Sequence, residues 1–472
     1  MAMPTSQEGR RFLPTAKAGG IRAALLMSTL PFEAIPTVTV PEERRRNPVA
    51  YLMEAALAHG PIFRRKTPAR LVNRFGPWQV YLVGPEANRF VLHTHRHLFA
   101  HAQGWRAYFG GLWNDNLLYL DGADHAAHRK VLAPAFTTAY IARYLHTMHR
   151  LVAERTIDWA ERDLVEVRAE VRDLAFEVVA EALLGFAPPA TVRQLHALRD
   201  TLCRNPHPFG KEAYRQHILT YRTALNAALN EAIATRPPHA TDDLLDLMGA
   251  SLNDPDGVLD DEHFLGHLHV LLEAGHTTTM DTATLVVGLL ATHPHHQAEV
   301  RAEVDAVWAA HDGNITLEAL RAMPALGRAI DEAGRLRTPV DTAPRGTLAD
   351  VEFGGYLIPQ GTFVRLHLGA CHRLPTVFAD PTRFDPARFA PPREEDKRTP
   401  YGLVTFGGGP RICIGLQFAQ IEMKALMAHL LHHFIITPIE GLTPRNVYDP
   451  ADCDDSLPRG LPLRFVQRTA LA

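Results

Sequence analysis

The segment FGGGPRICIG, residues 406–415, places one cysteine after a glycine-rich turn and just before a long apolar stretch. Glycines allow left-handed backbone angles and let the chain approach a flat cofactor closely. A thiolate is stabilised by backbone N–H groups and by the N-terminus of a helix. The pattern therefore favours Cys413 as a chemically active thiol, with Arg411 facing an anionic cofactor edge.

Two other interpretations of this segment compete with a reactive thiol. An isolated cysteine is often only a buried structural residue, and glycines before a helix also cradle phosphate. The phosphate interpretation fails because no Gly-Lys-Ser/Thr ends the loop and Pro410 removes one N–H donor.

The spacing Phe406-x-x-Gly409-x-Arg411-x-Cys413-x-Gly415 resembles the haem-binding signature of the cytochrome P450 family. The resemblance implies a mainly α protein in which a helix-rich core surrounds haem b and a small β-sheet part accompanies it. It makes Cys413 the thiolate ligand of the iron, and it assigns Phe406, Gly409, Arg411 and Gly415 to cofactor binding.

Two further motifs are similar to those of the same family. Glu332-x-x-Arg335 resembles its Glu-x-x-Arg helix motif, and Arg388 in Pro386–Phe389 resembles the arginine that completes that charged network. Alone, a Glu-x-x-Arg pair is an ordinary helix-surface salt bridge. Gly334 departs from the family pattern, where leucine is common, and glycine costs a helix interior about 1 kcal/mol relative to alanine.

His125-x-x-x-Arg129 has the i,i+4 spacing that puts both side chains on one helix face. Similar pairs in soluble bacterial members of the family hold the haem propionates. Arg345 and Arg411 resemble the remaining propionate partners, since a guanidinium group donates two hydrogen bonds to a carboxylate.

Residues 274–279, AGHTTT, lie midway along a long apolar stretch and resemble the family's oxygen-binding segment. Ala274 and Gly275 are expected to leave space beside the iron, and Thr278 matches the oxygen-activating threonine. Thr277 is predicted as the second catalytic residue, although it stands where relatives usually carry Asp or Glu. A hydroxyl orders water but does not supply the acid that oxygen cleavage requires, so the source of protons is the open mechanistic question.

Composition narrows the class of partner. The 472 residues carry a formal net charge of -3, which provides no positive field for nucleic acid. Four cysteines without CxxC pairing are typical of a reducing cytoplasm. The apolar stretch 23–30 is far shorter than the ~20 residues of a bilayer span, and no small-residue cleavage site follows it.

Hydrophobic spacing predicts one catalytic domain over residues 36–472, preceded by a flexible arm over residues 1–35. Helices are expected at 48–59, within 121–236, at 264–290 and at 415–434. Strands are expected at 69–75, 78–83, 351–359 and 362–368, with coil at 375–392 and a strand-capable tail.

The leading hypothesis is a monomeric monooxygenase that takes electrons from a separate ferredoxin or flavodoxin, because no flavin or iron–sulfur motif is present. A peroxide-driven or non-oxidative haem-thiolate enzyme is the alternative that Thr277 motivates, and a non-catalytic haem or zinc binder is the third. Aromatic residues in segments 103–118 and 205–221 predict a lipophilic small-molecule substrate.

Overall fold

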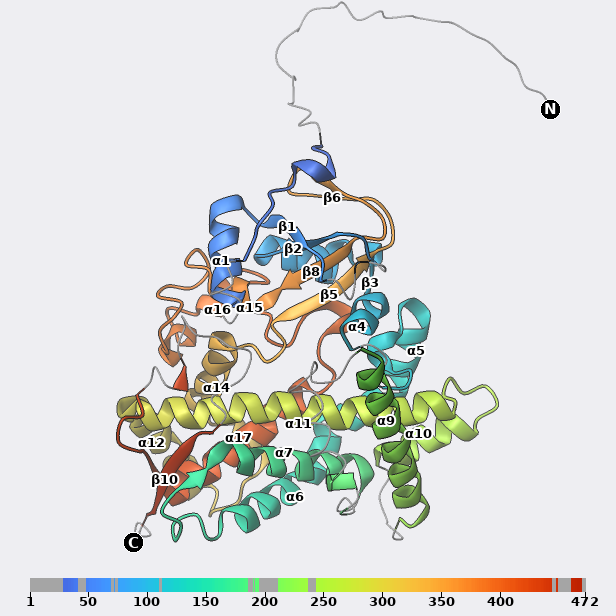
Figure 1. The fold of residues 1–472 in the computed structure, drawn as a ribbon. Coiled ribbons are helices and arrows are strands. Elements are labelled where there is room, and N and C mark those ends of the chain that lie inside the picture. Colours follow the sequence, from blue (N-terminus) through green and yellow to red (C-terminus); the bar gives the residue numbers. More distant parts are fainter. Residues whose placement is uncertain are drawn as a thin grey trace, which may run out of the picture.

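The computed structural model describes residues 29–40, 48–68, 72, 75–109, 113–185, 190, 192–194, 211–236, 243–443, 447–448 and 460–468. Helices dominate this part of the chain, and the strands gather mainly at one end of the molecule (Figure 1). The prediction of a mainly α fold with a small β part is confirmed.

The helices vary in length from four to 32 residues. They are α1 (Pro48–His59), α3 (Pro85–Arg89), α4 (His101–Phe109), α5 (Gly122–Leu132), α6 (Thr138–Thr156), α7 (Val167–Leu184), α9 (Lys211–Ala234), α10 (Leu244–Asn253), α11 (Asp261–Thr292), α12 (Pro294–Ala310), α13 (Leu317–Arg321), α14 (Pro324–Leu336), α15 (Leu368–Cys371), α16 (Glu395–Arg398) and α17 (Leu416–His433).

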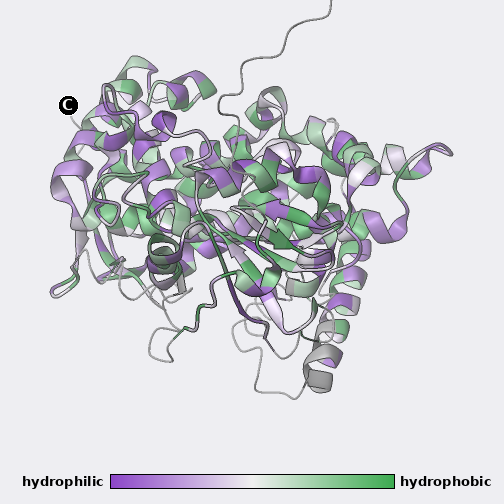
Figure 2. Ribbon diagram, turned by 90° about the horizontal axis from the view of Figure 1, so that it is seen from above, coloured by the Kyte–Doolittle hydropathy of each residue, from purple (hydrophilic) through white to green (hydrophobic). Residues whose placement is uncertain are grey.

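The strands are short. They are β1 (Ile62–Lys66), β2 (Trp78–Leu82), β3 (Phe99–Ala100), β4 (Val165–Glu166), β5 (Thr342–Thr347), β6 (Val351–Phe353), β7 (Tyr356–Ile358), β8 (Phe363–His367), β9 (Phe434–Pro438) and β10 (Pro462–Gln467). The largest sheet has the order β1-β2-β8-β5-β3, in which β2 and β8 run parallel and the other neighbours are antiparallel. Its central strands mix apolar and polar residues, since β8 reads FVRLH and β5 reads TAPRGT. Apolar and polar residues are interspersed along the ribbons in the view from above (Figure 2).

Helix α11 crosses the whole molecule between the sheet and the helices α6, α7 and α17 (Figure 1). Its start is fixed by Asp260, whose carboxylate accepts a hydrogen bond from the N–H of His263, and Asp261 and Glu262 favour the positive end of the helix dipole. It ends before Pro294, which begins the next helix. Among the described residues, no helix is long and apolar enough to span a membrane.

The main core forms where α6, α7, α11, α12, α14 and α17 pack together with β9 and β10. Leu285, Val287 and Leu430 are among its fully buried side chains. This packing fixes α11 against α17, which directly follows the cysteine loop, so the loop and the middle of α11 are held in one rigid unit.

Most expected elements are confirmed, including α1, α11, α17 and the strands after residue 351. The structure describes two residues of the strand expected at 69–75, Val72 and Phe75, and both are helical, so the prediction is wrong at these residues. The antiparallel partner of β2 is β1, and its parallel partner is β8. Strand β1 was not predicted because Arg64, Arg65 and Lys66 hide its alternation. Strand β5 was missed as well, since its sequence TAPRGT contains proline and glycine.

The expected arm differs from the structure at its C-terminal end. Residues 1–28 lie outside the described part of the chain, but the N–H of Leu30 donates to the carbonyl of Gly355, and Leu30 pairs with Tyr356. Ile35 is only 1% exposed. Residues 29–35 are therefore packed onto the β6–β7 hairpin and the large sheet, and they are not an arm.

Candidate functional site

The cysteine loop is shaped by glycines that no other residue replaces without strain. Gly407 and Gly409 have φ angles of 74° and 62°, in the left-handed region. A Cβ on Gly409 would lie 2.1 Å from the carbonyl oxygen of Leu92. The N–H of Cys413 donates to the carbonyl of Phe406 at 2.9 Å, which closes the loop.

A cavity of about 280 Å³ lies between this loop and the middle of α11. Cys413, Phe406 and Gly415 line it from the loop, Ala274, Gly275 and Thr278 from α11, and Arg345 and Arg411 from β5 and the loop. The structure thus brings eight of the residues predicted from sequence to one cavity. Gly409, Thr277, His125 and Arg129 do not line it.

The two threonines on α11 differ in where they lie. The hydroxyl of Thr278 donates to the carbonyl of Ala274 at 2.7 Å, and the residue lines the cavity. The hydroxyl of Thr277 donates to the carbonyl of Glu273 at 2.8 Å, away from the cavity lining. Gly275 also lets α7 approach, because a Cβ there would lie 2.6 Å from Cγ2 of Val179.

Two guanidinium groups give one wall of the cavity a positive charge. Arg345 is 5% exposed and donates only to the carbonyl of Pro344, and within the described residues no carboxylate forms an ion pair with it. Burial and the charge of Arg411 lower the pKa of Arg345 to about 9, so it remains charged at pH 7. Arg411 pairs with Asp121 at 2.8 Å.

His125 and Arg129 lie behind the loop. The guanidinium of Arg129 donates to the carbonyl of Ile412 at 2.8 Å, next to Cys413. His125 is buried, and burial with the charges of Arg411 and Arg129 lowers its pKa to about 4. In this arrangement Arg129 supports the loop, and a role of the pair in holding carboxylates stays a prediction.

His101 and Trp105 were missed by the sequence analysis as a pair. The indole N–H of Trp105 donates to Nε2 of His101 at 3.0 Å, while Nδ1 of His101 hydrogen-bonds the carbonyl of Leu118. Both line the cavity. Their i,i+4 spacing on α4 was the available signal.

Only part of the expected substrate segments reaches the cavity. Trp105 and Leu118 line it, whereas Phe109 and Trp113 contact each other, with ring centroids 4.3 Å apart and ring planes tilted by 47°. Residues 205–210 fall outside the described residues. Tyr221 is buried among the residues of α7, α9 and α10 and is absent from the lining.

Helix α4 reaches the cavity because glycines let it touch β5. A Cβ on Gly104 would lie 2.4 Å from the backbone of Pro344, and one on Gly346 would lie 1.9 Å from Gln103. This close contact sets Trp105 beside Arg345, although 240 residues separate them in the sequence.

The Glu332, Arg335 and Arg388 side chains form a fully buried ion network beneath the cavity. Glu332 accepts from Arg335 Nε at 2.7 Å and from Arg388 Nε at 2.9 Å, and all three are 0% exposed. The salt bridge that the sequence would leave on a helix surface is therefore internal. Gly334 lines the cavity, and a Cβ there would lie 3.0 Å from Cγ2 of Thr405.

The residues present fit the haem that the resemblance implies. A thiol faces the cavity, and its wall carries a buried guanidinium that pairs with no carboxylate of the described residues. The loop holds Gly407 and Gly409 at left-handed φ angles, and at Gly409 the backbone of Leu92 leaves no room for a side chain. Burial raises the pKa of the Cys413 thiol, against donation from Gly415 and the charge of Arg129, which lower it. A cation at the sulfur would offset that burial and favour the thiolate.

Comparison with known proteins gives consistent similarities. Residues 194–454 match the family model "Cytochrome P450". A putative cytochrome P450 136 of Mycobacterium tuberculosis is 31% identical over 365 residues, which cover 75% of this chain and 73% of the relative. A putative cytochrome P450 120 of Synechocystis is 28% identical over 83% of this chain and 87% of its own length.

Solved structures share the fold. Retinoic acid-bound cyanobacterial CYP120A1 superposes with a TM-score of 0.76 at 26% identity, covering 89% of this chain and 95% of the other. The haem domain of cytochrome P450DA superposes with a TM-score of 0.76 at 22% identity, covering 93% and 98%. The latter identity supports the fold alone.

Proposed function

We propose that this chain, which belongs to the cytochrome P450 family of haem-thiolate monooxygenases, inserts one oxygen atom into a lipophilic small molecule with electrons from a separate ferredoxin or flavodoxin. The cofactor in this proposal is haem b, held by the thiolate of Cys413. The observation that carries the proposal is the single cavity lined by the Cys413 thiol, the cationic side chains Arg345 and Arg411, and Thr278 of α11.

Each residue has a separate task. Arg345 and Arg411 would hold the carboxylates of the cofactor, because guanidinium groups bind carboxylates through charge-assisted hydrogen bonds. Haem supplies the oxygen activation when it is bound. Thr278 places its hydroxyl group, which forms hydrogen bonds, beside Ala274 and Gly275 in the cavity lining. The apolar side chains around it exclude water from the reacting groups.

A lipophilic substrate is supported by the walls of the cavity, which include Trp105, Leu183 and Leu271. The names of similar proteins point the same way. CYP120A1 was solved with retinoic acid, and a taxoid 7-beta-hydroxylase of Taxus cuspidata is 26% identical over 83% of this chain. We propose an extended, largely apolar substrate of that class, handled by a monomer in a reducing cytoplasm.

The direct test is the carbon monoxide complex of the reduced, haem-loaded protein. Wild type is expected to show thiolate-type absorbance, and Cys413→Ala is expected to lose it. Cys371→Ala is the matched control, because Cys371 is fully buried away from the cavity and should leave the spectrum unchanged. Thiolate-type absorbance that survives Cys413→Ala would refute the assignment.

Substrate class and electron source are tested separately. Spectral titration with retinoic acid, taxanes, fatty acids and steroids should give saturable shifts for extended apolar compounds, and ¹⁸O₂ should label the product. Turnover with hydrogen peroxide alone that equals turnover with ferredoxin and its reductase would favour the peroxide-driven alternative, which Thr277 motivates.

A further inference from the structure

The turn between α11 and α12 is rich in metal-ligating side chains. Residues 293–299 read HPHHQAE, and His295, His296 and Glu299 lie in the first two turns of α12. Side chains three and four residues apart share one face of a helix, so Glu299 is a neighbour of both histidines. One ligand atom from each of these three side chains lies within 4.8 Å of the other two. Among the described residues, no other three histidine, cysteine or acidic side chains converge in this way.

The chemistry of these ligands selects the kind of ion. Two imidazoles and one carboxylate suit late transition metals such as zinc, whereas magnesium and calcium prefer sites built from oxygen atoms. In a tetrahedral zinc site, with metal–ligand distances of about 2.0–2.2 Å, neighbouring ligand atoms lie about 3.4 Å apart. His295 and Glu299 are exposed, so rotation of their side chains is able to bring the three ligand atoms to that spacing. The fourth position is left to water.

The ring of His296 already stands at a suitable distance from Glu299. Its Nδ1 lies 3.7 Å from a carboxylate oxygen of Glu299, which is too long for a hydrogen bond but close to the spacing of two zinc ligands. The ring packs edge-on against Phe384, with centroids 5.5 Å apart, and the side chain is 19% exposed. This contact limits the rotation of the imidazole before an ion binds.

The backbone beneath the three side chains is held in place by Gln297. This residue is 4% exposed, and its side-chain NH₂ group donates to the carbonyls of Leu290 and Ile436, while its Oε1 accepts from the N–H of Ile436. These hydrogen bonds tie the start of α12 to the end of α11 and to β9. A fixed backbone reduces the conformational entropy that is lost when side chains close on an ion.

The dipole of α12 opposes a cation at this end of the helix, and two features offset it. The N-terminus of a helix carries a partial positive charge from its unpaired N–H groups. Pro294 occupies the first helical position and has no N–H, which removes one of those groups. The carboxylate of Glu299 supplies a full negative charge beside the two imidazoles.

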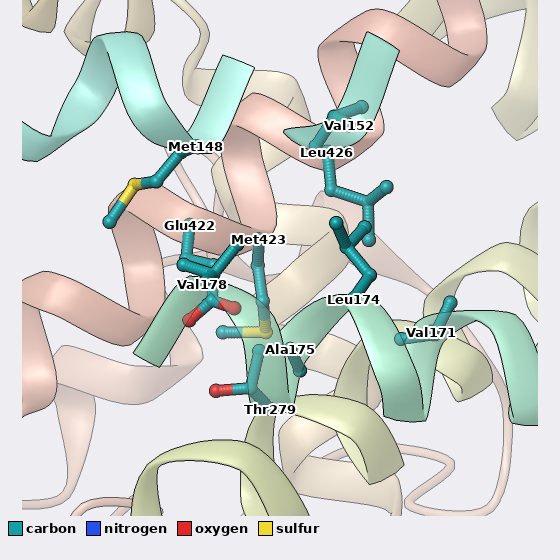
Figure 3. A pocket seen from close by; sticks show the side chains of 10 residues that line it. All are labelled: Met148, Val152, Val171, Leu174, Ala175, Val178, Thr279, Glu422, Met423 and Leu426. Carbon is teal, nitrogen blue, oxygen red and sulfur yellow. The ribbon is translucent and has the colours of Figure 1, made fainter. Parts of the chain in front are cut away.

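A second group of histidines lies where α6 packs on α17. His149 of α6 and His429 and His433 of α17 have successive ring centroids 5.8 and 4.4 Å apart. They are about one helical turn from Val152 and Leu426, which line a small apolar cavity of about 10 Å³ (Figure 3). The ligand atoms of these three histidines do not all lie within 4.8 Å of one another. This group is therefore the competing site that an experiment has to distinguish.

We propose that His295, His296 and Glu299 bind one divalent late transition metal ion at the start of α12. The ion links side chains from two successive turns beside the corner where α11 ends. Because it binds only the folded chain, it stabilises that corner. None of the three residues lines the large cavity, so the metal site is separate from the haem site and does not depend on the proposed function.

Equilibrium dialysis of the untagged, haem-loaded protein against zinc chloride, followed by elemental analysis, tests the site. Wild type is expected to bind one high-affinity equivalent of zinc. His295→Ala, His296→Ala and Glu299→Gln should each weaken its binding at least about tenfold, since loss of even an outer-shell partner costs about 10–100-fold in metal affinity. Absence of a high-affinity equivalent in wild type would overturn the proposal.

His311→Ala is the matched control, because His311 lies at the C-terminal end of α12 and belongs to no converging group. It should bind zinc like wild type, and so should His433→Ala. Zinc that is lost in His433→Ala but kept in His296→Ala would assign the ion to the competing group and overturn the proposal. Circular dichroism and the carbon monoxide spectrum verify that each variant keeps its fold.

X-ray absorption at the zinc edge identifies the ligands without interference from iron. With one equivalent of zinc, wild type should show nitrogen and oxygen neighbours at about 2.0–2.2 Å and the scattering of two imidazoles, and His296→Ala should show one imidazole. Sulfur neighbours at about 2.3 Å would place the ion at a cysteine and overturn the assignment. Zinc should also raise the Tm of wild type and not that of the double variant His295→Ala/His296→Ala. An equal rise in both proteins would show that these side chains do not carry the effect.

Discussion

Replacing Glu332 by glutamine tests whether the buried ion network holds the cavity together. The carboxylate accepts hydrogen bonds from Arg335 Nε, Arg335 Nη2 and Arg388 Nε at 2.7–2.9 Å, and from the backbone N–H of Asp385 at 3.0 Å. Glutamine keeps the shape, but it removes the charge and turns an NH₂ group toward a guanidinium. Two buried cations then lose their shared anion.

The expected loss follows from the burial of this network. Breaking a buried ion pair costs about 3–5 kcal/mol, because the remaining charge stays desolvated. Arg388 keeps its pair with Glu395, so the uncompensated charge is that of Arg335, whose other acceptors are carbonyl groups. A whole domain is stable by only about 5–15 kcal/mol. We therefore expect Glu332→Gln to lose about 3 kcal/mol or more of unfolding free energy, and to retain haem poorly.

Urea unfolding followed by circular dichroism, on samples of equal haem content, measures this loss. Asp163→Asn is the control, because its pair with Arg464 spans 3.1 Å between side chains that are 85% and 53% exposed. Exposed pairs contribute about 0–1 kcal/mol. An unfolding free energy of Glu332→Gln within about 1 kcal/mol of wild type, like the control, would refute the reasoning.

Three other changes have defined outcomes. Burial lowers the pKa of His372 to about 3, and its Nε2 accepts a hydrogen bond from the N–H of Val404, so the residue is neutral in the folded protein. Below about pH 6.5 it should contribute a loss of stability of about 1.4 kcal/mol per pH unit, added to the losses from other buried histidines such as His267 and His367. Urea titration should give a slope smaller by that amount in His372→Gln. An equal slope would contradict this. Arg345→Leu should weaken haem binding at least about tenfold in a titration of apoprotein, since charged hydrogen bonds contribute about 1.5–3 kcal/mol, and unchanged affinity would exclude a carboxylate role. Gly334→Leu should lower Tm, because the new side chain would crowd Thr405 at a cost of about 1–3 kcal/mol. This cost exceeds the gain in helix propensity, which is about 1 kcal/mol. A higher Tm would show that the contact relaxes.

The features that the sequence predicts well are those encoded by neighbouring residues. The left-handed glycines of the cysteine loop are a local signal, and so are the apolar periodicity and the N-cap of α11. They predict the loop that carries Cys413 and the helix that carries Thr278. Strand β5 was missed because Pro344 and Gly346 contradict strand propensity, and tertiary pairing with β8 overrides that preference.

The sequence by itself determined the family, the thiol and the order of the motifs, because each is a short pattern with its own local conformation. Only tertiary packing brings Arg345 and Trp105 to the same cavity and buries the Glu332 network completely. Such meetings depend on close packing between segments far apart in the chain.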